Sequence, residues 1–385
     1  MQIRHVRVGI AIGIVSYFGA CAPVTFDAVP QSKGGNVVTR CEGSACYYDV
    51  TEEKTVGQGM VDILIVNDNS GSMSYEQAKM AGAFSGFLTS LDGLDYRIAM
   101  TTTDIASSSG TRPDSLYYNP PSAYNGNGAL QDGRLVEFTS GQKYLEKSTY
   151  NKETLFNNTI KRPETLQCEQ SGYTQCPSGD ERGIYAANLT LKNYSSQFMR
   201  MGAHLAVIVL ADEDERGVSK YNPASDSNSQ QIKSLYPLEA SDEPQSFIDS
   251  FRSLFPSKTM SWHSIVIKNG DSGCLSAQSG QGGNAWVRGA YGSAYQKLSE
   301  MTSGLVGNIC ASNYTTQLQD IGYTIKDQVT SLPFRCRPID DQFEVQFGGL
   351  VATSGFAADF NAMTLNISAA LAPSTKVTLK YTCSK

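Results

Sequence analysis

The run HLAVIVLAD, from His204 to Asp212, is the feature that most constrains the fold of this chain. Its side chains are apolar without alternation. A strand built from it must therefore be covered on both faces, as strands are in parallel sheets between layers of helices. A second run, VDILIVN from Val61 to Asn67, has the same character. Strand-like and amphipathic helical segments alternate around these runs. The sequence predicts an α/β fold with a doubly wound, mostly parallel sheet.

The other elements of this sheet follow from apolar periodicity. The predicted strands are 96–104, 260–268 and 304–310, with 132–138 as a further short strand, and the predicted helices are 80–91, 181–191, 244–255, 294–301 and 314–329. The alternation ends near Pro333.

The last part of the chain has a different period. Phe343–Phe347 and Lys376–Cys383 alternate apolar and polar residues, as half-buried antiparallel strands do. We therefore predict a small all-β module over residues 333–385.

The first twenty residues have the pattern of a signal peptide. Arg4 and Arg7 precede an apolar segment, Val8–Ala20, that is too short to span a bilayer comfortably. Phe18–Cys21, FGAC, resembles a bacterial lipobox. The resemblance implies cleavage before Cys21 and lipidation of its thiol, with palmitate among the acyl chains. The alternative is a plain secretory signal with an incidental cysteine.

Cysteine usage agrees with export. The chain has nine cysteines, and setting Cys21 aside for lipid leaves an even number for disulfides in an oxidising compartment. Proximity suggests the pairs Cys41–Cys46, Cys168–Cys176, Cys274–Cys310 and Cys336–Cys383. The alternative, a metal knuckle, lacks the two-residue spacing of zinc sites. The Gly- and Pro-containing residues 21–57 are interpreted as a tether with a disulfide-pinned turn.

Length and charge set further limits. With 385 residues the chain is long enough for two cores. The formal net charge is -6, and no run of like charge is long enough to indicate a patch for nucleic acid or anionic lipid. We expect no nucleic-acid partner.

A carboxylate and two hydroxyls follow the first buried run: Asp68, Ser70 and Ser72. Asp212 ends the second run. In a doubly wound sheet, ligands bind beyond the carboxyl ends of the strands, where strand order reverses. If the two strands are neighbours, these oxygen groups face one crevice. Oxygen ligands of this kind suit Mg²⁺ or Ca²⁺.

The motif resembles a known family. VDILIVNDNSGSM, Val61 to Met73, is similar to the start of a von Willebrand factor A domain, and its acid and two hydroxyls match that family's Asp-x-Ser-x-Ser metal-ion-dependent adhesion site. Asp212 matches the aspartate that ends the family's fourth strand. The resemblance covers about residues 58–332. It implies a divalent cation and a protein partner bound at the metal face.

One position departs from the family pattern. The family normally supplies a threonine from the loop before the third helix, and here that place falls on Glu181, with Asp180 as the second choice. Three carboxylates around a dication leave a net charge of about -1. Coulomb repulsion then disfavours a partner that would complete the metal shell with its own carboxylate.

Each acidic residue has a simpler alternative role. Asp68, Ser70 or Ser72 could cap the next helix. Glu213–Glu215 could be a second calcium loop, but we favour a solvated acidic turn. Asp104, at the end of the second strand, could approach the metal or serve as a cap.

The sequence speaks against an enzyme. It lacks a Gly-x-Ser-x-Gly elbow, a His-Glu-x-x-His motif and a phosphate-binding loop. His204 begins its strand far from the crevice and His263 lies mid-strand, so we interpret both as structural. A metal-dependent hydrolase is therefore the weaker hypothesis.

The large insertion, residues 105–180, has the composition of a binding loop. Tyr117, Tyr118 and Tyr124 stand among Asn, Ser and Gly, as in adaptable protein-binding loops. The alternative is a loop that only decorates the surface.

Together these patterns predict a lipid-anchored bacterial envelope protein that mediates metal-dependent adhesion or protein interaction. A structural subunit of an envelope complex that faces the periplasm is the alternative. Ala22, after the lipidated cysteine, is not the aspartate associated with inner-membrane retention in enteric bacteria, which favours the outer membrane.

Overall fold

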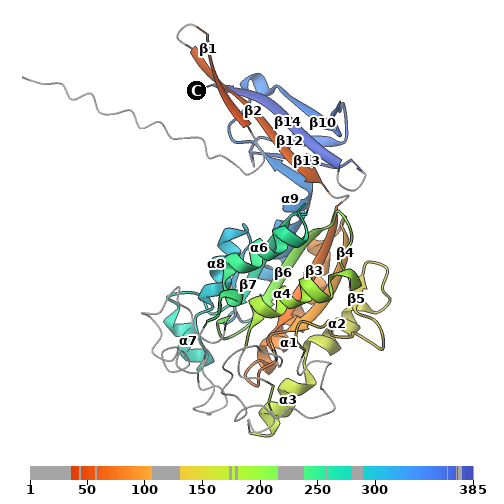
Figure 1. The fold of residues 1–385 in the computed structure, drawn as a ribbon, viewed down its shortest axis with the longest axis vertical. Helices are drawn as coiled ribbons and strands as arrows, with labels where there is room; N and C mark the ends of the chain where they lie inside the picture. The colour runs from red at the N-terminus through yellow and green to blue at the C-terminus, as the bar shows by residue number, and fades with distance from the viewer. Residues whose placement is uncertain are drawn as a thin grey trace, which may run out of the picture.

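The structure is a computed structural model. It describes residues 36–42, 45–56, 59–105, 131–172, 176–177, 181–215, 238–256, 258–279, 289–361, 363–369, 371 and 375–384. Figure 1 shows an α/β domain and, at its upper end, a β module.

The α/β domain is built on a six-stranded sheet. Its strands are β3 (Met60–Asn67), β4 (Asp95–Thr102), β5 (Tyr144–Glu146), β6 (His204–Leu210), β7 (Met260–Val266) and β8 (Val306–Asn308). They lie in the order β5-β4-β3-β6-β7-β8. The β4, β3, β6, β7 and β8 pairings are parallel, and β5 joins the edge antiparallel to β4. The sheet is thus mixed and mostly parallel.

Two helical layers cover this sheet. Ile63 and Ile65 of β3 belong to a core with α1 (Ser74–Ser90), α2 (Lys152–Ile160) and α9 (Thr315–Thr330). Leu64 and Val66 belong to a second core with α4 (Gly183–Asn193), α6 (Pro244–Leu254) and α8 (Ser293–Met301). Successive strand residues point to opposite faces, which explains why the buried strands are apolar throughout.

Shorter helices lie near the end of the sheet that is remote from the β module (Figure 1). These are α3 (Pro163–Gln170) and α7 (Ser272–Gln278). The 3₁₀ turns are η3 (Ser195–Gln197), η5 (Ala240–Asp242) and η7 (Ile339–Asp341).

The β module contains two antiparallel sheets around its own core. One has the order β1 (Asn36–Glu42), β2 (Ala45–Val56), β14 (Thr375–Ser384), β10 (Phe343–Phe347) and β11 (Leu350–Val351). The other has the order β12 (Phe356–Asp359), β13 (Thr364–Ile367) and β9 (Ser331–Pro333). Leu332, Val345 and Leu379 are among the residues buried between them.

The interpretation of residues 21–57 as a tether is wrong for its described part. Residues 36–56 form the β1–β2 hairpin, and β2 pairs along its length with β14, from Thr375↔Val56 to Ser384↔Tyr47. The β module is therefore assembled from both ends of the chain rather than from residues 333–385 alone. The physical reason is that β10 pairs with only one edge of β14, and β2 supplies the backbone hydrogen bonds for the other edge.

The insertion also differs from expectation. Residues 132–138 are not a strand, although Val136 donates its N–H to the Met100 carbonyl at 2.8 Å. The edge strand is β5 instead. The insertion also supplies α2 and α3, and Phe156 of α2 stacks on Phe84 of α1 with ring centroids 3.6 Å apart. Residues 106–130, with the three tyrosines, lie outside the described residues.

Four disulfides are present. They join Cys41 to Cys46, Cys168 to Cys176, Cys274 to Cys310 and Cys336 to Cys383, the same pairs that sequence proximity suggests. One pair lies in the β1–β2 hairpin and another links β14 to the segment after β9, so two of the four belong to the β module.

The chain enters and leaves the α/β domain at the β module. Met60 of β3 closely follows β2, and α9 leads directly into β9. Lys54 of β2 donates to the Ser331 carbonyl at 2.5 Å, and Arg335 pairs with Glu52. The carboxyl ends of the parallel strands therefore lie at the opposite end of the domain (Figure 1).

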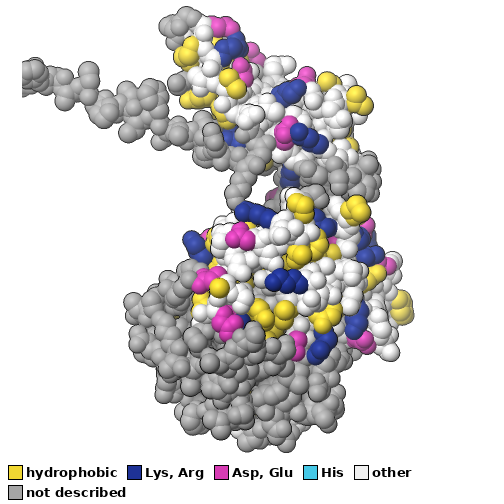
Figure 2. Space-filling model, viewed as in Figure 1, with side chains coloured by type: hydrophobic (Ala, Val, Ile, Leu, Met, Phe, Trp, Pro, Cys, Tyr) yellow, Lys and Arg dark blue, Asp and Glu magenta, His cyan; other side chains and the backbone are white. Residues whose placement is uncertain are grey.

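The outer surface carries both signs of charge. On the face drawn in Figure 2, Lys and Arg side chains are interspersed with Asp and Glu over the described parts of the domain and the module. No helix among the described residues is long and apolar enough to cross a membrane. The predicted signal peptide and Cys21 lie outside the described residues.

Candidate metal site

Asp68 and Asp212 leave neighbouring strands at the same edge of the sheet. β3 and β6 pair in parallel up to Asn67↔Leu210. The Asp68 N–H then donates to the Leu210 carbonyl at 3.0 Å, so the pairing continues past the strands. Because both strands run in the same direction, the two carboxylates come to one place, as the sequence predicts.

Glu181 is brought to the same place by the end of β4. The residue forms an isolated antiparallel bridge with Asp104, and the N–H of Arg182 donates to the Thr103 carbonyl at 3.0 Å. Glu181 thus lies at the end of the strand next to β3. Carboxylate oxygens of Asp68, Glu181 and Asp212 all lie within 4.8 Å of one another. We call these three residues the acidic triad.

The two serines border the triad. Ser70 donates its N–H to Asp68 Oδ1 at 2.8 Å, and its hydroxyl lies 3.0 Å from the Ser72 hydroxyl. The Ser72 hydroxyl lowers the pKa of Asp212, against the larger effect of burial that raises it. Both serines are partly exposed, whereas the triad is buried. The structure therefore brings all five predicted ligand residues together.

Burial makes three adjacent carboxylates electrostatically unfavourable. Burial raises the pKa of Glu181 well above its ordinary value, and the charges of Asp68 and Glu213 raise it further. Burial and the Asp68 charge likewise raise the pKa of Asp212 well above its ordinary value. The pKa of Asp68 is also raised, mainly by burial. A cation or bound protons must offset this repulsion.

Several triad oxygens lack a hydrogen-bond donor. Within the described part of the chain, no hydrogen bond of ordinary geometry reaches Asp68 Oδ2, Glu181 Oε2 or either Asp212 carboxylate oxygen. Leaving buried polar atoms unsatisfied is costly. Clustered carboxylate oxygens with hydroxyls beside them are the donor set of a hard dication, so the residues present fit Mg²⁺ or Ca²⁺.

A buried hydrogen-bond network holds the loop after β3. Gln77 Nε2 donates to the Asp68 carbonyl at 2.9 Å and to the Thr165 hydroxyl at 3.1 Å. The Thr165 hydroxyl donates to the Asn69 carbonyl at 2.8 Å. Gln77 Oε1 accepts from the Arg162 N–H at 2.9 Å. The insertion thus fixes the loop after β3 through α3 and the residue before it.

The capping alternative is not supported for α1. The residue at the start of this helix is Met73, and no side chain among the described residues makes a capping hydrogen bond there. Asp68, Ser70 and Ser72 instead interact with one another and with the triad.

The acidic turn after Asp212 differs from the expectation of a solvated turn. It is not a solvated turn, because Asp214 and Glu215 are fully buried. Asp214 Oδ1 accepts from the Ala294 N–H at 2.9 Å, at the start of α8. Glu215 accepts from the N–H groups of Ile184 and Tyr185 at 2.7 and 3.1 Å, at the start of α4. These residues satisfy helix N-termini.

Asp104 is buried beside Glu181 but does not belong to the triad. Among the described residues, the group of clustered metal-ligating atoms contains Asp68, Glu181 and Asp212 only. The position of Asp180 lies outside the described residues.

Arg182 anchors the segment that carries Glu181. Its buried guanidinium pairs with Asp242 at 2.5 Å and with Glu239 at 3.1 Å, and stacks over the Tyr185 ring at 4.0 Å. The start of α4 is therefore held from two sides, by Arg182 and by Glu215.

Both histidines of the described part are engaged in the core. His204 contacts the hydroxyls of Thr259 at 2.8 Å and Ser261 at 2.9 Å. His263 accepts from the Leu305 N–H at 3.0 Å. Burial lowers the pKa of each to about 3, so both are neutral at physiological pH. The structure thus gives both histidines structural positions.

Sequence reasoning missed Glu76. This fully buried carboxylate in the first turn of α1 raises the pKa of both Asp68 and Asp212 through its charge. The available signal is its place in the first turn of the helix that directly follows the motif Asp68–Ser72. For Glu215 the sequence holds no comparable signal, because the helix it caps begins far away in the chain.

Comparison with known proteins gives structural likeness only. No protein-family model matches the chain, and no curated protein matches its sequence. Similar solved structures include a von Willebrand factor type A protein from Catenulispora acidiphila, at 11% identity and a TM-score of 0.34 over 91% of this chain. They also include the pilus adhesins SpaC from Lactobacillus rhamnosus GG (13%, TM-score 0.30) and RrgA from Streptococcus pneumoniae (10%, TM-score 0.29), each over 90% of this chain. The alignments span 66%, 42% and 60% of those three chains, so this chain covers two thirds or less of each.

Proposed function

We propose that this protein binds a divalent cation at the acidic triad and uses that end of a von Willebrand factor A-type domain for cation-dependent adhesion or protein binding. The observation that carries the proposal is the meeting of three buried carboxylates within 4.8 Å, several of whose oxygens receive no hydrogen bond of ordinary geometry from the described residues.

The ion would be Mg²⁺ or Ca²⁺, held by Asp68, Ser70, Ser72, Glu181 and Asp212. It would supply positive charge to a buried cluster that is otherwise repulsive. The order of the motif along the chain supports this: an acid and two hydroxyls after β3, and a second acid after the neighbouring β6.

Binding is favoured over catalysis. A hydrolase that used the ion would need a group placed to move protons at the site. The described histidines, His204 and His263, are hydrogen-bonded on β6 and β7 with lowered pKa values. Asp214 and Glu215 are committed to helix termini.

The polarity of the fold favours display of the site away from an anchor. The proposed lipid at Cys21 precedes β1 of the β module, and the triad lies at the strand ends that point away from that module (Figure 1). Lipidation in the bacterial envelope, at the outer membrane, would then place the β module nearer the bilayer and the metal face farther out.

Affinity capture with and without chelator tests this function. Wild type and Asp68→Ala, both lacking the signal peptide, are immobilised and exposed to proteins of the envelope fraction in Mg²⁺ plus Ca²⁺ or in EDTA. We expect one set of partners that is retained by wild type with cation and lost both in EDTA and in Asp68→Ala. Retention that is insensitive to chelator and to the substitution would contradict the proposal.

A further inference from the structure

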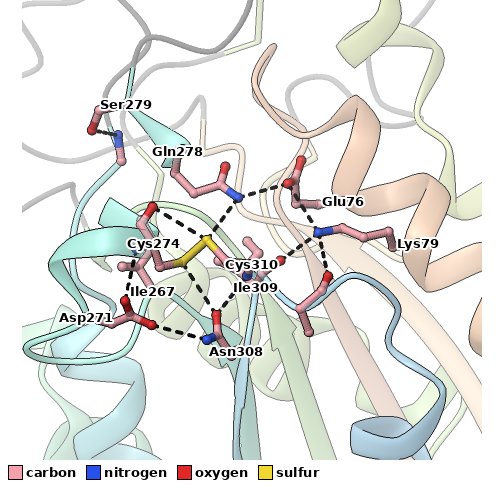
Figure 3. The surroundings of a disulfide bond; sticks show 12 residues. Glu76, Lys79, Ile267, Asp271, Cys274, Gln278, Ser279, Asn308, Ile309 and Cys310 are labelled. Atoms are coloured by element: carbon pink, nitrogen blue, oxygen red, sulfur yellow. Dashed lines mark hydrogen bonds and ion pairs between the residues drawn. A yellow bond between two sulfur atoms is a disulfide. The ribbon is translucent and has the colours of Figure 1, made fainter. Parts of the chain in front are cut away.

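A buried chain of contacts links a carboxylate next to the loop that carries Asp68 to a disulfide. It consists of Glu76 on α1, Gln278 at the end of α7 and the Cys274–Cys310 disulfide (Figure 3). Gln278 Nε2 donates to Glu76 Oε1 at 2.9 Å and lies 3.8 Å from Cys310 Sγ. These residues come from three separate segments that meet at the triad end of the sheet.

Glu76 lies immediately beside the metal loop. Its neighbour Gln77 donates to the Asp68 carbonyl at 2.9 Å, and the Glu76 charge acts on both Asp68 and Asp212. Glu76 is fully buried, and its Oε2 meets no hydrogen-bond donor within the described part of the chain. Glu76 is thus a fourth buried carboxylate, and its charge repels those of Asp68 and Asp212.

The structural partners of Glu76 satisfy one of its two oxygens. An acid in the first turn of a helix is favoured by the helix dipole, but surface exposure suffices for that effect. The Lys79 ammonium has three N–H donors: its Nζ lies 3.7 Å from Glu76 Oε1, and it donates to the carbonyls of Ile309 at 2.7 Å and Ala311 at 3.1 Å. One oxygen of Glu76 is therefore held by Gln278 and Lys79, and the other is left without a donor.

The disulfide holds the helix that carries Gln278. α7 has seven residues, and Cys274 ties it to the segment after β8. Asp271 caps α7 through the Cys274 N–H at 3.0 Å and is itself held by Asn308 Nδ2 at 3.2 Å (Figure 3). Such a short helix depends on these attachments for its position.

We infer that Glu76 is a further carboxylate of the cation site, one that strengthens cation binding from behind the direct ligands, and that Gln278 on the disulfide-anchored α7 positions it. This inference rests on the proposed cation binding. Partners behind the ligands of metal sites orient those ligands, and losing one typically lowers metal affinity by roughly 10-fold to 100-fold.

Calorimetric titration of Ca²⁺ and of Mg²⁺ tests the inference in wild type, Glu76→Gln, Gln278→Met and the double variant. Glu76→Gln keeps an acceptor for Gln278, and Gln278→Met keeps side-chain length without a donor. Asp320→Asn, an exposed carboxylate on α9, is the matched charge control. We expect Glu76→Gln to weaken binding roughly 10-fold or more. Gln278→Met should weaken it less, and the double variant no more than Glu76→Gln alone.

The role of the disulfide is tested with the double variant Cys274→Ser/Cys310→Ser. The control is Cys41→Ser/Cys46→Ser, which removes a disulfide of the β module instead. Only the loss of the Cys274–Cys310 disulfide should lower cation affinity.

Cation binding by wild type together with unchanged affinity in Glu76→Gln would overturn the inference and leave the proposed function standing. Additive losses in the double variant would overturn the positioning role of Gln278. A wild type that binds neither cation would overturn both proposals.

Discussion

The backbone N–H of Asp68 donates to the carbonyl of Leu210 at 3.0 Å, one residue beyond the paired ends of β3 and β6. This bond fixes the loop after one strand to the end of its neighbour. The bond thereby brings the Asp68 and Asp212 side chains close to each other through the backbone alone. The backbone assembles a cluster of carboxylates that repel one another, and the predictions below follow from that repulsion.

Stability of the cation-free protein should fall as pH rises. The folded pKa values of Asp68, Asp212 and Glu181 are raised above ordinary values of 3.8 and 4.5, mainly by burial. Above those ordinary values the unfolded chain releases protons that the folded protein keeps, so the free energy of unfolding decreases with pH. Chemical denaturation in EDTA between about pH 5 and pH 8 should show this decrease. Saturating Ca²⁺ should remove it, and identical profiles with and without Ca²⁺ would contradict the role of the triad.

Glu181→Thr should weaken the cation site. It removes one of the three carboxylates of the acidic triad, and unit charges about 4 Å apart interact by several kcal/mol near a protein surface. We expect Ca²⁺ affinity to fall roughly 10-fold or more, while the cation-free form gains stability because repulsion is relieved. An acidic partner should bind the variant better than wild type. Equal Ca²⁺ affinities in calorimetry would show that Glu181 is not a ligand.

Glu215→Ala should destabilise the fold through α4. The Glu215 carboxylate accepts from two N–H groups at the start of that helix. Loss of a helix cap costs about 1–2 kcal/mol. Glu213→Ala, in the same turn and partly exposed, is the control and should cost less. Denaturant titration in EDTA measures both, and equal losses in the two variants would argue against the capping role.

Cys21→Ser should release the protein from membranes. The lipobox-like FGAC sequence motivates this expectation. Fractionation of cells that produce wild type or variant measures it, with circular dichroism as a check that the released protein is folded. A variant that stays in the membrane pellet would place the anchor elsewhere.

Buried strands made the α/β domain predictable. Runs such as Ile63–Val66 and Leu205–Leu210 are apolar because both faces are covered, and the position of the acids after them follows from strand direction. The triad could be predicted for the same reason, since parallel strands bring their carboxyl ends to one edge.

Features that depend on distant partners could not be predicted. β2 contains the polar run Thr51–Lys54, and it becomes an interior strand of its sheet only because β14, from a distant part of the chain, pairs with it. Asp214 and Glu215 are acidic residues in a turn, which usually indicates exposure. They are buried here because two helices from other parts of the chain begin beside them.

Calorimetric titration of Ca²⁺ and Mg²⁺ into wild type and Asp68→Ala tests the central claim most directly. Asp68 is buried in the triad and does not cap α1, so its removal should spare the fold. We predict saturable binding of one dication by wild type and its loss in Asp68→Ala, with unchanged circular dichroism. Equal affinity in the two proteins, or no binding by wild type, would contradict the assignment of the acidic triad as a cation site.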